Sequence, residues 1–142
     1  MHIDVIEDMD TFNRLRENWD EVYDADPHAT LFLSWNWLFA WLEKLSTPWI
    51  VLAAKENGSD AHYVAFFPLR IDTRIDEEGR LFNDLRMAGS HAADYCGLIS
   101  FPRSEADAIS AFAQQIKRLS WIDFVLGNFC GSDDRFRKLV SC

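Results

Sequence analysis

The stretch TLFLSWNWLFAWLEKL, residues 30–45, decides how the rest of the chain is arranged. Ser34 suits a helix N-cap, and after it apolar residues recur at three- and four-residue steps, which predicts a helix. Because most of its circumference is apolar, we expect this helix to be covered by other parts of the protein. The strongly polar side chains fall near one narrow stripe and are those of Asn36, Glu43 and Lys44.

The composition of the 142-residue chain is that of one globular domain. Hydrophobic residues make up 49% and aromatic residues 14% of the chain, enough for one core without disulfides or metal. The formal net charge is −9, so the chain has no basic face that would release counterions from nucleic acid or from an anionic membrane. We therefore expect no nucleic-acid partner.

The cysteines and the first residues predict a cytoplasmic protein. Cys96, Cys130 and Cys142 are odd in number and widely spaced, which indicates neither a disulfide framework nor a zinc site. The first ten residues carry acids where a signal peptide needs a basic start. No segment approaches the roughly 18 uncharged apolar residues that a membrane helix needs, so we expect no membrane span.

The segments before the Trp-rich helix predict a strand followed by one amphipathic helix. Residues 2–6 suit a first strand, and Asp8 or Asp10 suits the cap of the helix. The helix is expected to end before Pro27, because proline disfavours helical geometry in the preceding residue. Its apolar face consists of Phe12, Leu15, Trp19, Val22 and Tyr23.

The segments after the Trp-rich helix predict an antiparallel meander. Residues 49–55 suit a buried strand, and the pair Asn57-Gly58 favours a hairpin turn. Residues 61–75 suit a long return strand with Pro68 in its middle. Because proline lacks a ladder donor, we expect a bulge or a sheet edge at Pro68.

The second half of the chain continues this mixed pattern. Residues 76–79 predict a turn into a third strand, and residues 89–95 interrupt the strand pattern with small and polar side chains. The elements that follow are predicted as a strand at 96–100, a helix opened by Pro102 and Ser104, a strand at 121–126 and the start of a helix at 135–140. The sequence thus predicts an α+β fold with a mixed, mostly antiparallel sheet flanked by helices.

The order of these elements and four short patterns carry a family resemblance. The order is that of the GNAT acyltransferase fold up to its fifth strand. Together with the patterns, it resembles the N-terminal part of the CelD-type, BioF-like acetyltransferases, which are relatives of the FemAB peptidyltransferases. The patterns are Phe32-x-Ser34-x-x-Trp37-Leu38-x-Ala40-Trp41, Phe67-Pro68-Leu69, Gly89 followed by Asp94-Tyr95, and Trp121-Ile122-Asp123.

The resemblance implies a bacterial protein of more than twice this length with two GNAT-like halves. Such a protein transfers an acyl group from acetyl-CoA or acyl-CoA to a small-molecule acceptor, an amine or amino sugar, in envelope or exopolysaccharide metabolism. Residues 1–142 would then be one N-terminal, acceptor-side domain. Its second half would be supplied in cis or by another chain.

The chain departs from the family pattern in two ways. It stops before the last helix and strands of a GNAT unit, so we expect a sheet that is incomplete at its C-terminal end and an open edge through which two copies would pair. It also lacks the Arg/Gln-x-x-Gly-x-Gly/Ala loop that cradles a pyrophosphate, so no cofactor-binding residue is assigned. Glu105 and Asp107 near the corresponding helix start would repel the pyrophosphate, and Arg103 offsets this only in part. We expect no cofactor on this half, and the alternative is a non-catalytic binding or assembly module.

His91, Asp94 and Tyr95 are the candidate catalytic residues. Acyl transfer to an amine needs a base and a proton donor for the leaving thiolate. His91 suits the base, Asp94 its orienting partner or an anchor for the amine, and Tyr95 the donor. The alternative is that Asp94 is a turn residue and Tyr95 a packing residue, as is common in such loops.

The other candidates have stronger structural explanations. The tryptophans Trp35, Trp37 and Trp41 suit an aromatic wall for a substrate, although tryptophans at helical spacing are more often core. Cys96 lies too close along the chain to His91 and Asp94 to form a triad with them. No metal is predicted, because the spacing of the acidic groups does not match a calcium loop. These groups are Asp4, Glu7, Asp8 and Asp10, and Asp76, Glu77 and Glu78.

Overall fold

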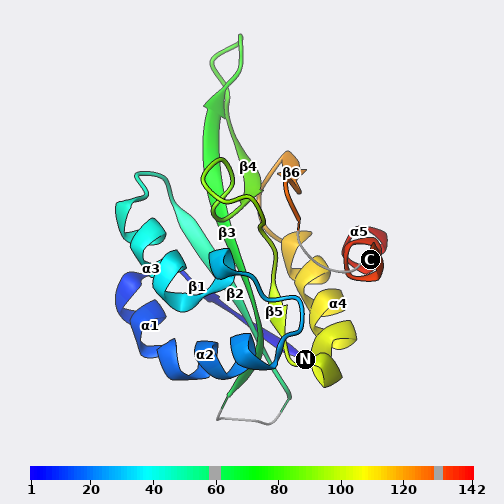
Figure 1. The fold of residues 1–142 in the computed structure, drawn as a ribbon. Coiled ribbons are helices and arrows are strands. Elements are labelled where there is room, and N and C mark those ends of the chain that lie inside the picture. Colours follow the sequence, from blue (N-terminus) through cyan, green and yellow to red (C-terminus); the bar gives the residue numbers. More distant parts are fainter. Residues whose placement is uncertain (58–61, 130–132) are drawn as a thin grey trace.

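The computed structural model describes residues 1–57, 62–129 and 133–142 of the chain. A six-stranded, mostly antiparallel open sheet lies between two layers of helices (Figure 1). The predicted α+β class, with a mixed sheet flanked by helices, is therefore confirmed. None of the described helices is both long enough and apolar enough to cross a membrane.

The strands follow one another across the sheet in nearly the order of the chain. Consecutive strands from the first to the fourth pair antiparallel, and the last strand pairs parallel with the fourth. The predicted meander is thus confirmed, whereas Gly58 of the predicted hairpin turn lies outside the described residues. Along the sheet the order is β1 (His2–Ile6), β2 (Trp49–Lys55), β3 (Tyr63–Ile75), β4 (Leu81–Met87) and β6 (Asp123–Val125), with β5 (Ile99–Ser100) paired to β3.

The segment after β1 forms two helices, so the prediction of a single helix is wrong. They are α1 (Met9–Arg14) and α2 (Arg16–Ala25), and they meet at Leu15, whose N–H bonds to the oxygen of Phe12. This tight turn ends α1 and lets the buried rings of Phe12 and Trp19 meet edge-on, with centroids 5.4 Å apart. Asp8 is the cap, because its carboxylate accepts a bond from the Thr11 N–H.

The Trp-rich stretch begins with a 3-10 turn, η1 (Leu31–Leu33), and its helix is α3 (Trp35–Lys44). Ser34 caps α3 as predicted, since its hydroxyl accepts a bond from the Trp37 N–H. The helix is covered on one side only. Its buried side chains are those of Trp35, Leu38 and Leu42, whereas Trp37, Phe39 and Trp41 are half-buried.

Pro68 produces neither a bulge nor an edge, so this prediction is wrong. The register shift between β2 and β3 lies elsewhere, at Ala54 and Lys55. At Pro68 the strand changes partner, pairing with β5 at Ala65 and Phe66 and with β4 from Leu69 onward. The missing N–H faces the end of β4, where the Ala88 N–H donates to the oxygen of Pro68 but no bond returns from the proline. The proline thus lies where the pairing of β3 with β4 ends.

The second helical layer contains η2 (Pro102–Ser104), α4 (Glu105–Ile116) and α5 (Asp133–Ser141). The helix predicted from Pro102 is confirmed. Both late strands are shorter than predicted, and Cys96 forms only an isolated parallel bridge with Phe129. The segment at 96–100 thus pairs at both ends and is not a continuous strand.

The alternation of β3 separates two hydrophobic cores, one on each face of the sheet. Phe66 and Phe67 are adjacent and both fully buried, and in a strand such neighbours point to opposite faces. Phe66 stacks on Trp19 of α2, with ring centroids 4.6 Å apart. Phe67 contacts Phe112 of α4, with centroids 5.7 Å apart. The strand therefore holds both helical layers.

Candidate functional site

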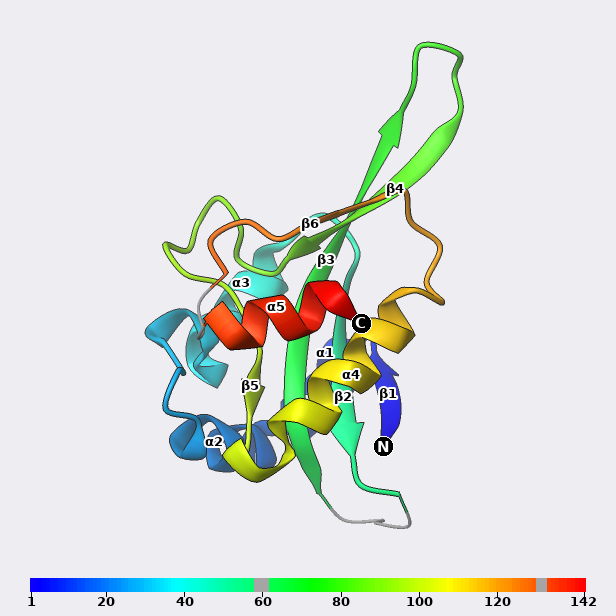
Figure 2. The ribbon, with the colours of Figure 1, turned by 90° about the vertical axis from the view of Figure 1, so that its right-hand side faces the viewer.

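The parallel strands β4 and β6 part at their carboxyl ends and leave a cavity there. Their pairing ends at Arg86 and Val125. Beyond it the loop 89–95 and the segment 126–129 run beside each other, as the yellow-green and orange traces in Figure 2 show. The two are tied together by the Cys96 N–H, which donates to the oxygen of Asn128.

This cavity has a volume of about 200 Å³ and will be called the β4–β6 cavity. Ligands commonly bind in crevices where the carboxyl ends of parallel strands diverge, held by a few convergent polar groups. The polar side chains here come from β4, from the loop and from the segment after β6. The lining residues are Arg86, Ser90, His91, Val125, Gly127 and Asn128.

Unusual backbone conformations concentrate around the β4–β6 cavity. Among the described residues, two non-glycine residues have positive φ, His91 at 77° and Asn128 at 54°, and both line the cavity. Gly89 also has positive φ, 82°, and a Cβ there would lie 3.1 Å from the ring of Trp37. Backbone strain of this kind clusters at functional sites. At Gly89 the loop also packs closely on α3.

Two of the polar groups at the cavity have notable surroundings. The hydroxyl oxygen of Ser90 is buried and has no hydrogen-bond partner within the described part of the chain. The Asn128 amide is positioned by a long bond of 3.4 Å to the oxygen of Ala93. A buried hydroxyl without a partner costs free energy, so the Ser90 hydroxyl can gain from bonding to a group that enters the cavity.

A row of alternating charges leads away from the cavity along β3 and β4. We call it the arginine–aspartate ladder, and it comprises Arg70, Asp72, Arg74, Asp84 and Arg86. Cross-strand pairing sets Arg70 opposite Arg86, and Asp72 opposite Asp84, so these side chains share one face of the sheet. Asp84 is completely buried and forms an ion pair with Arg74. The ladder thus ends at the cavity with Arg86.

The predicted catalytic residues are only partly brought together. His91 lines the β4–β6 cavity and is exposed there. Asp94 and Tyr95 are also exposed, and between the described atoms no hydrogen bond or ion pair joins the three side chains. The structure thus places His91 at the cavity, while the roles of Asp94 and Tyr95 stay predictions.

The three predicted substrate-binding tryptophans differ in their surroundings. Trp35 is buried, with its ring stacked on Phe12 and Phe39, which fits the core explanation. Trp37 and Trp41 are half-buried and stack on each other at 6.2 Å. Trp37 supports the cavity loop through Gly89. Contact of these rings with a substrate stays a prediction.

Sequence reasoning missed Arg86, Ser90 and Asn128. Arg86 lies in a strand of alternating charge, where a solvated face is the simplest explanation. Gly127-Asn128 resembles an ordinary turn. Only the parallel pairing of β4 with β6 brings the three side chains to one place, and no short-range pattern in the sequence predicts that pairing.

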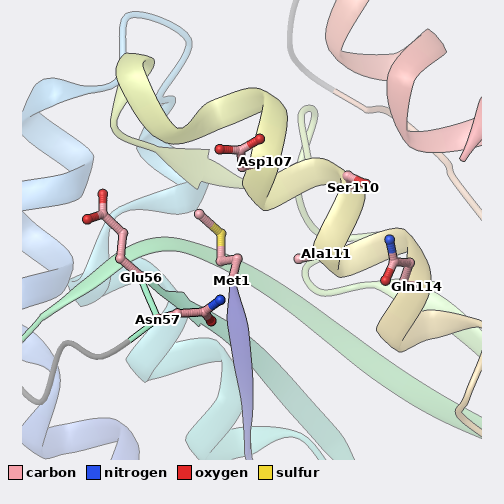
Figure 3. A pocket seen from close by; sticks show the side chains of 7 residues that line it. All are labelled: Met1, Glu56, Asn57, Asp107, Ser110, Ala111 and Gln114. Carbon is pink, nitrogen blue, oxygen red and sulfur yellow. The ribbon is translucent and has the colours of Figure 1, made fainter.

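Three larger cavities lie elsewhere in the described part of the chain, and the smallest of them, about 290 Å³, lies between β1 and α4. One of about 480 Å³ opens between the start of β1, the end of β2 and α4 (Figure 3). The side chains of Met1, Glu56 and Asp107 are among those lining it, and none of the predicted site residues is there. Another, of about 390 Å³, is more apolar and lies among α4, β6 and α5. None of the three combines cationic, hydroxyl and imidazole groups as the β4–β6 cavity does.

Cys96 is buried, with 1% of its surface exposed, and burial raises the pKa of its thiol to about 11, opposed only weakly by Arg70. The thiol is therefore protonated at neutral pH and is a poor nucleophile. With Cys130 and Cys142 replaced by serine, we expect the native chain to resist a disulfide reagent that labels it fully once unfolded. A chain that retains the exposed Cys142 should react at once, and equally fast labelling of Cys96 would contradict its burial.

The acidic turn at 76–78 has a local explanation. The Asp76 carboxylate accepts bonds from the backbone N–H and the guanidinium of Arg80 and from the backbone N–H of Glu78, and these bonds lower its pKa. Among the described residues, no group of three or more His, Cys, Asp or Glu side chains is arranged to hold a metal ion.

Comparisons with protein-family models, with curated proteins and with solved structures found no match.

Proposed function

We propose that this chain is the acceptor-side half of a GNAT-type, acyl-CoA-dependent N-acyltransferase of the CelD-like kind, acting in exopolysaccharide or envelope metabolism. The observation that carries the proposal is the β4–β6 cavity. It lies at the carboxyl ends of the parallel strands β4 and β6. The strands of this sheet follow the same order of elements on which the family resemblance is based. Such a place suits a small acceptor, an amine or amino sugar.

The residues at the cavity have complementary roles in this proposal. His91 takes the proton from the attacking amine, because it is the imidazole that lines the cavity. Arg86, Ser90 and Asn128 orient the acceptor. Asp94 and Tyr95, which follow in the same loop, serve as the amine anchor and as the proton donor to the leaving thiolate.

Acetyl-CoA or another acyl-CoA is supplied by the second GNAT-like half, in cis or from another chain. The start of α4 supports this division of labour. Glu105 is the first residue of α4 and pairs with Arg135, and Asp107 adds a second negative charge in the first turn. Negative charge at a helix N-terminus opposes binding of a pyrophosphate.

A second candidate is a non-catalytic binding or assembly module with the same fold. It is favoured by the lack of hydrogen bonds among His91, Asp94 and Tyr95 within the described residues, and by the half-buried stack of Trp37 and Trp41. Such a stack offers apolar area to a partner. Pairing of two copies through an open sheet edge belongs to this candidate.

Calorimetric titration with acetyl-CoA, followed by NMR titration with glucosamine, separates the two candidates. We expect no micromolar binding of acetyl-CoA, because the start of α4 is acidic, and we expect glucosamine to shift the amide signals of Ser90, His91 and Asn128. Micromolar binding of acetyl-CoA would contradict the division of labour between the halves. A spectrum unchanged by glucosamine would favour the assembly module.

A further inference from the structure

The arginine–aspartate ladder carries one more positive than negative charge. Asp72 lies 2.8 Å from Arg70 and 3.1 Å from Arg86, measured between carboxylate oxygen and guanidinium nitrogen. Asp84 lies 2.5 Å from Arg74 and 3.7 Å from Arg86. Three guanidinium groups thus share two carboxylates. Asp123 also reaches Arg74, but its side chain is 61% exposed, so solvent screens that pair.

The excess positive charge is placed at the β4–β6 cavity. Arg86 is the member of the ladder that lines the cavity. Its Nε and Nη2 atoms are the ones that face Asp72 and Asp84. These contacts are ion pairs by distance, and the buried Nε atom has no hydrogen-bond partner within the described residues. The guanidinium therefore keeps N–H groups that can donate to a ligand, while its two carboxylate partners hold it near the cavity.

The other donors come from different directions around the cavity. Ser90 contributes a buried hydroxyl without a partner in the described chain, His91 a ring N–H and Asn128 an amide. They belong to the loop after β4 and to the segment after β6, on two sides of the cavity. A tetrahedral oxyanion accepts bonds from several directions at once, whereas a planar carboxylate is best matched by two parallel donors.

We propose that the β4–β6 cavity binds a phosphoryl group, carried by a phosphorylated acceptor. The excess charge of the ladder, the unsatisfied Arg86 guanidinium and the Ser90 hydroxyl, which has no partner within the described residues, together suit an anionic oxygen. The assignment of this phosphoryl group to the acceptor rests on the proposed function, because a phosphate of coenzyme A would make the same contacts with the cavity. Binding of the phosphoryl group itself rests on the cavity alone.

The experiment is an NMR titration of the isotope-labelled chain with inorganic phosphate. We expect the amide signals of Ser90, His91 and Asn128 to shift, and affinity to fall about tenfold in Arg86→Met. Ser90→Ala should weaken binding by a smaller factor without disturbing the ladder. Arg80→Met is the matched control, because this arginine is 72% exposed and pairs with Asp76 and Glu78 at the hairpin tip. It should bind phosphate like the parent chain.

Each outcome decides the proposal. Unchanged phosphate affinity in a folded Arg86→Met chain and in Ser90→Ala would overturn it, and so would acetate binding as tightly as phosphate. Glucosamine 6-phosphate should bind more tightly than phosphate or glucosamine. An Arg86-dependent site that preferred acetyl-CoA to the sugar phosphate would overturn the assignment to the acceptor. The proposed function fails instead if the parent chain binds acetyl-CoA, whatever the Arg86 variant does.

Discussion

Replacing Asp26 by alanine is expected to lower the free energy of unfolding by about 3–5 kcal/mol, because it removes one of the two carboxylates that pair with a buried guanidinium. Arg135 of α5 is completely buried, and its Nη2 lies 3.1 Å and 3.2 Å from the two carboxylate oxygens of Asp26. Asp26 also accepts a bond from the Ser100 N–H at 2.8 Å. The substitution therefore removes a charge partner and orphans a buried donor together.

Related variants separate these contributions in chemical denaturation. Asp26→Asn keeps an acceptor for Ser100 but loses the charge, so its loss should be smaller. The double variant Asp26→Leu with Arg135→Met should also lose less than Asp26→Ala, because it removes both completely buried charges and leaves only Glu105, whose side chain is 20% exposed, without its partner. Asp24→Ala is the control, because Asp24 is exposed two residues away. Equal stability of the Asp24 and Asp26 variants would show that the buried pair contributes nothing.

The same network bears on the cofactor. Glu105, the first residue of α4, accepts a bond from the Nε of Arg135, and Arg135 also donates to the oxygen of Leu98. Arg135 thereby joins α5, α4 and the end of α2, and α5 crosses the sheet in Figure 2. The carboxylate at the start of α4 is therefore held in place by a structural pair. A phosphate approaching that helix end would compete with it.

Much of the fold follows from local patterns in the sequence. Helical periodicity predicted α3 and α4, Ser34 was identified as a cap, and the apolar run at 49–55 predicted the buried strand β2. Local patterns did not reveal the break at Leu15, because it depends on how Phe12 and Trp19 pack against each other. Nor did they reveal the pairing of Asp26 with Arg135, which are 109 residues apart.

The sequence predicted a residue of the candidate site only where its side-chain type and its local segment were both distinctive. His91 stood out because it is an imidazole in a segment that interrupts the strand pattern. Arg86 did not, since its importance comes from a ladder whose members lie on two strands. Asn128 became visible only through the parallel pairing of β4 with β6. Residues that come together only through tertiary pairing cannot be recognised as neighbours from a single sequence.

Replacing Gly89 by alanine is expected to lower the free energy of unfolding by about 2–5 kcal/mol and to abolish phosphate binding. The φ of 82° costs an alanine about 1–2 kcal/mol. The new Cβ would also lie 3.1 Å from two ring atoms of Trp37 and 3.2 Å from the Cβ of Ala93. Both contacts are with packed side chains, so overpacking adds about 1–3 kcal/mol.

Gly79→Ala supplies the matched control, because Gly79 has nearly the same φ, 79°, but a Cβ there meets nothing within 4 Å. It should lose only the backbone cost of about 1–2 kcal/mol and bind phosphate normally. Adding Trp37→Leu to Gly89→Ala should then restore part of the lost stability, since the shorter side chain relieves the overpacking. Equal losses in the two glycine variants would mean that the loop does not press on α3. That result would contradict the inference that packing of the loop on the Trp-rich helix shapes the β4–β6 cavity.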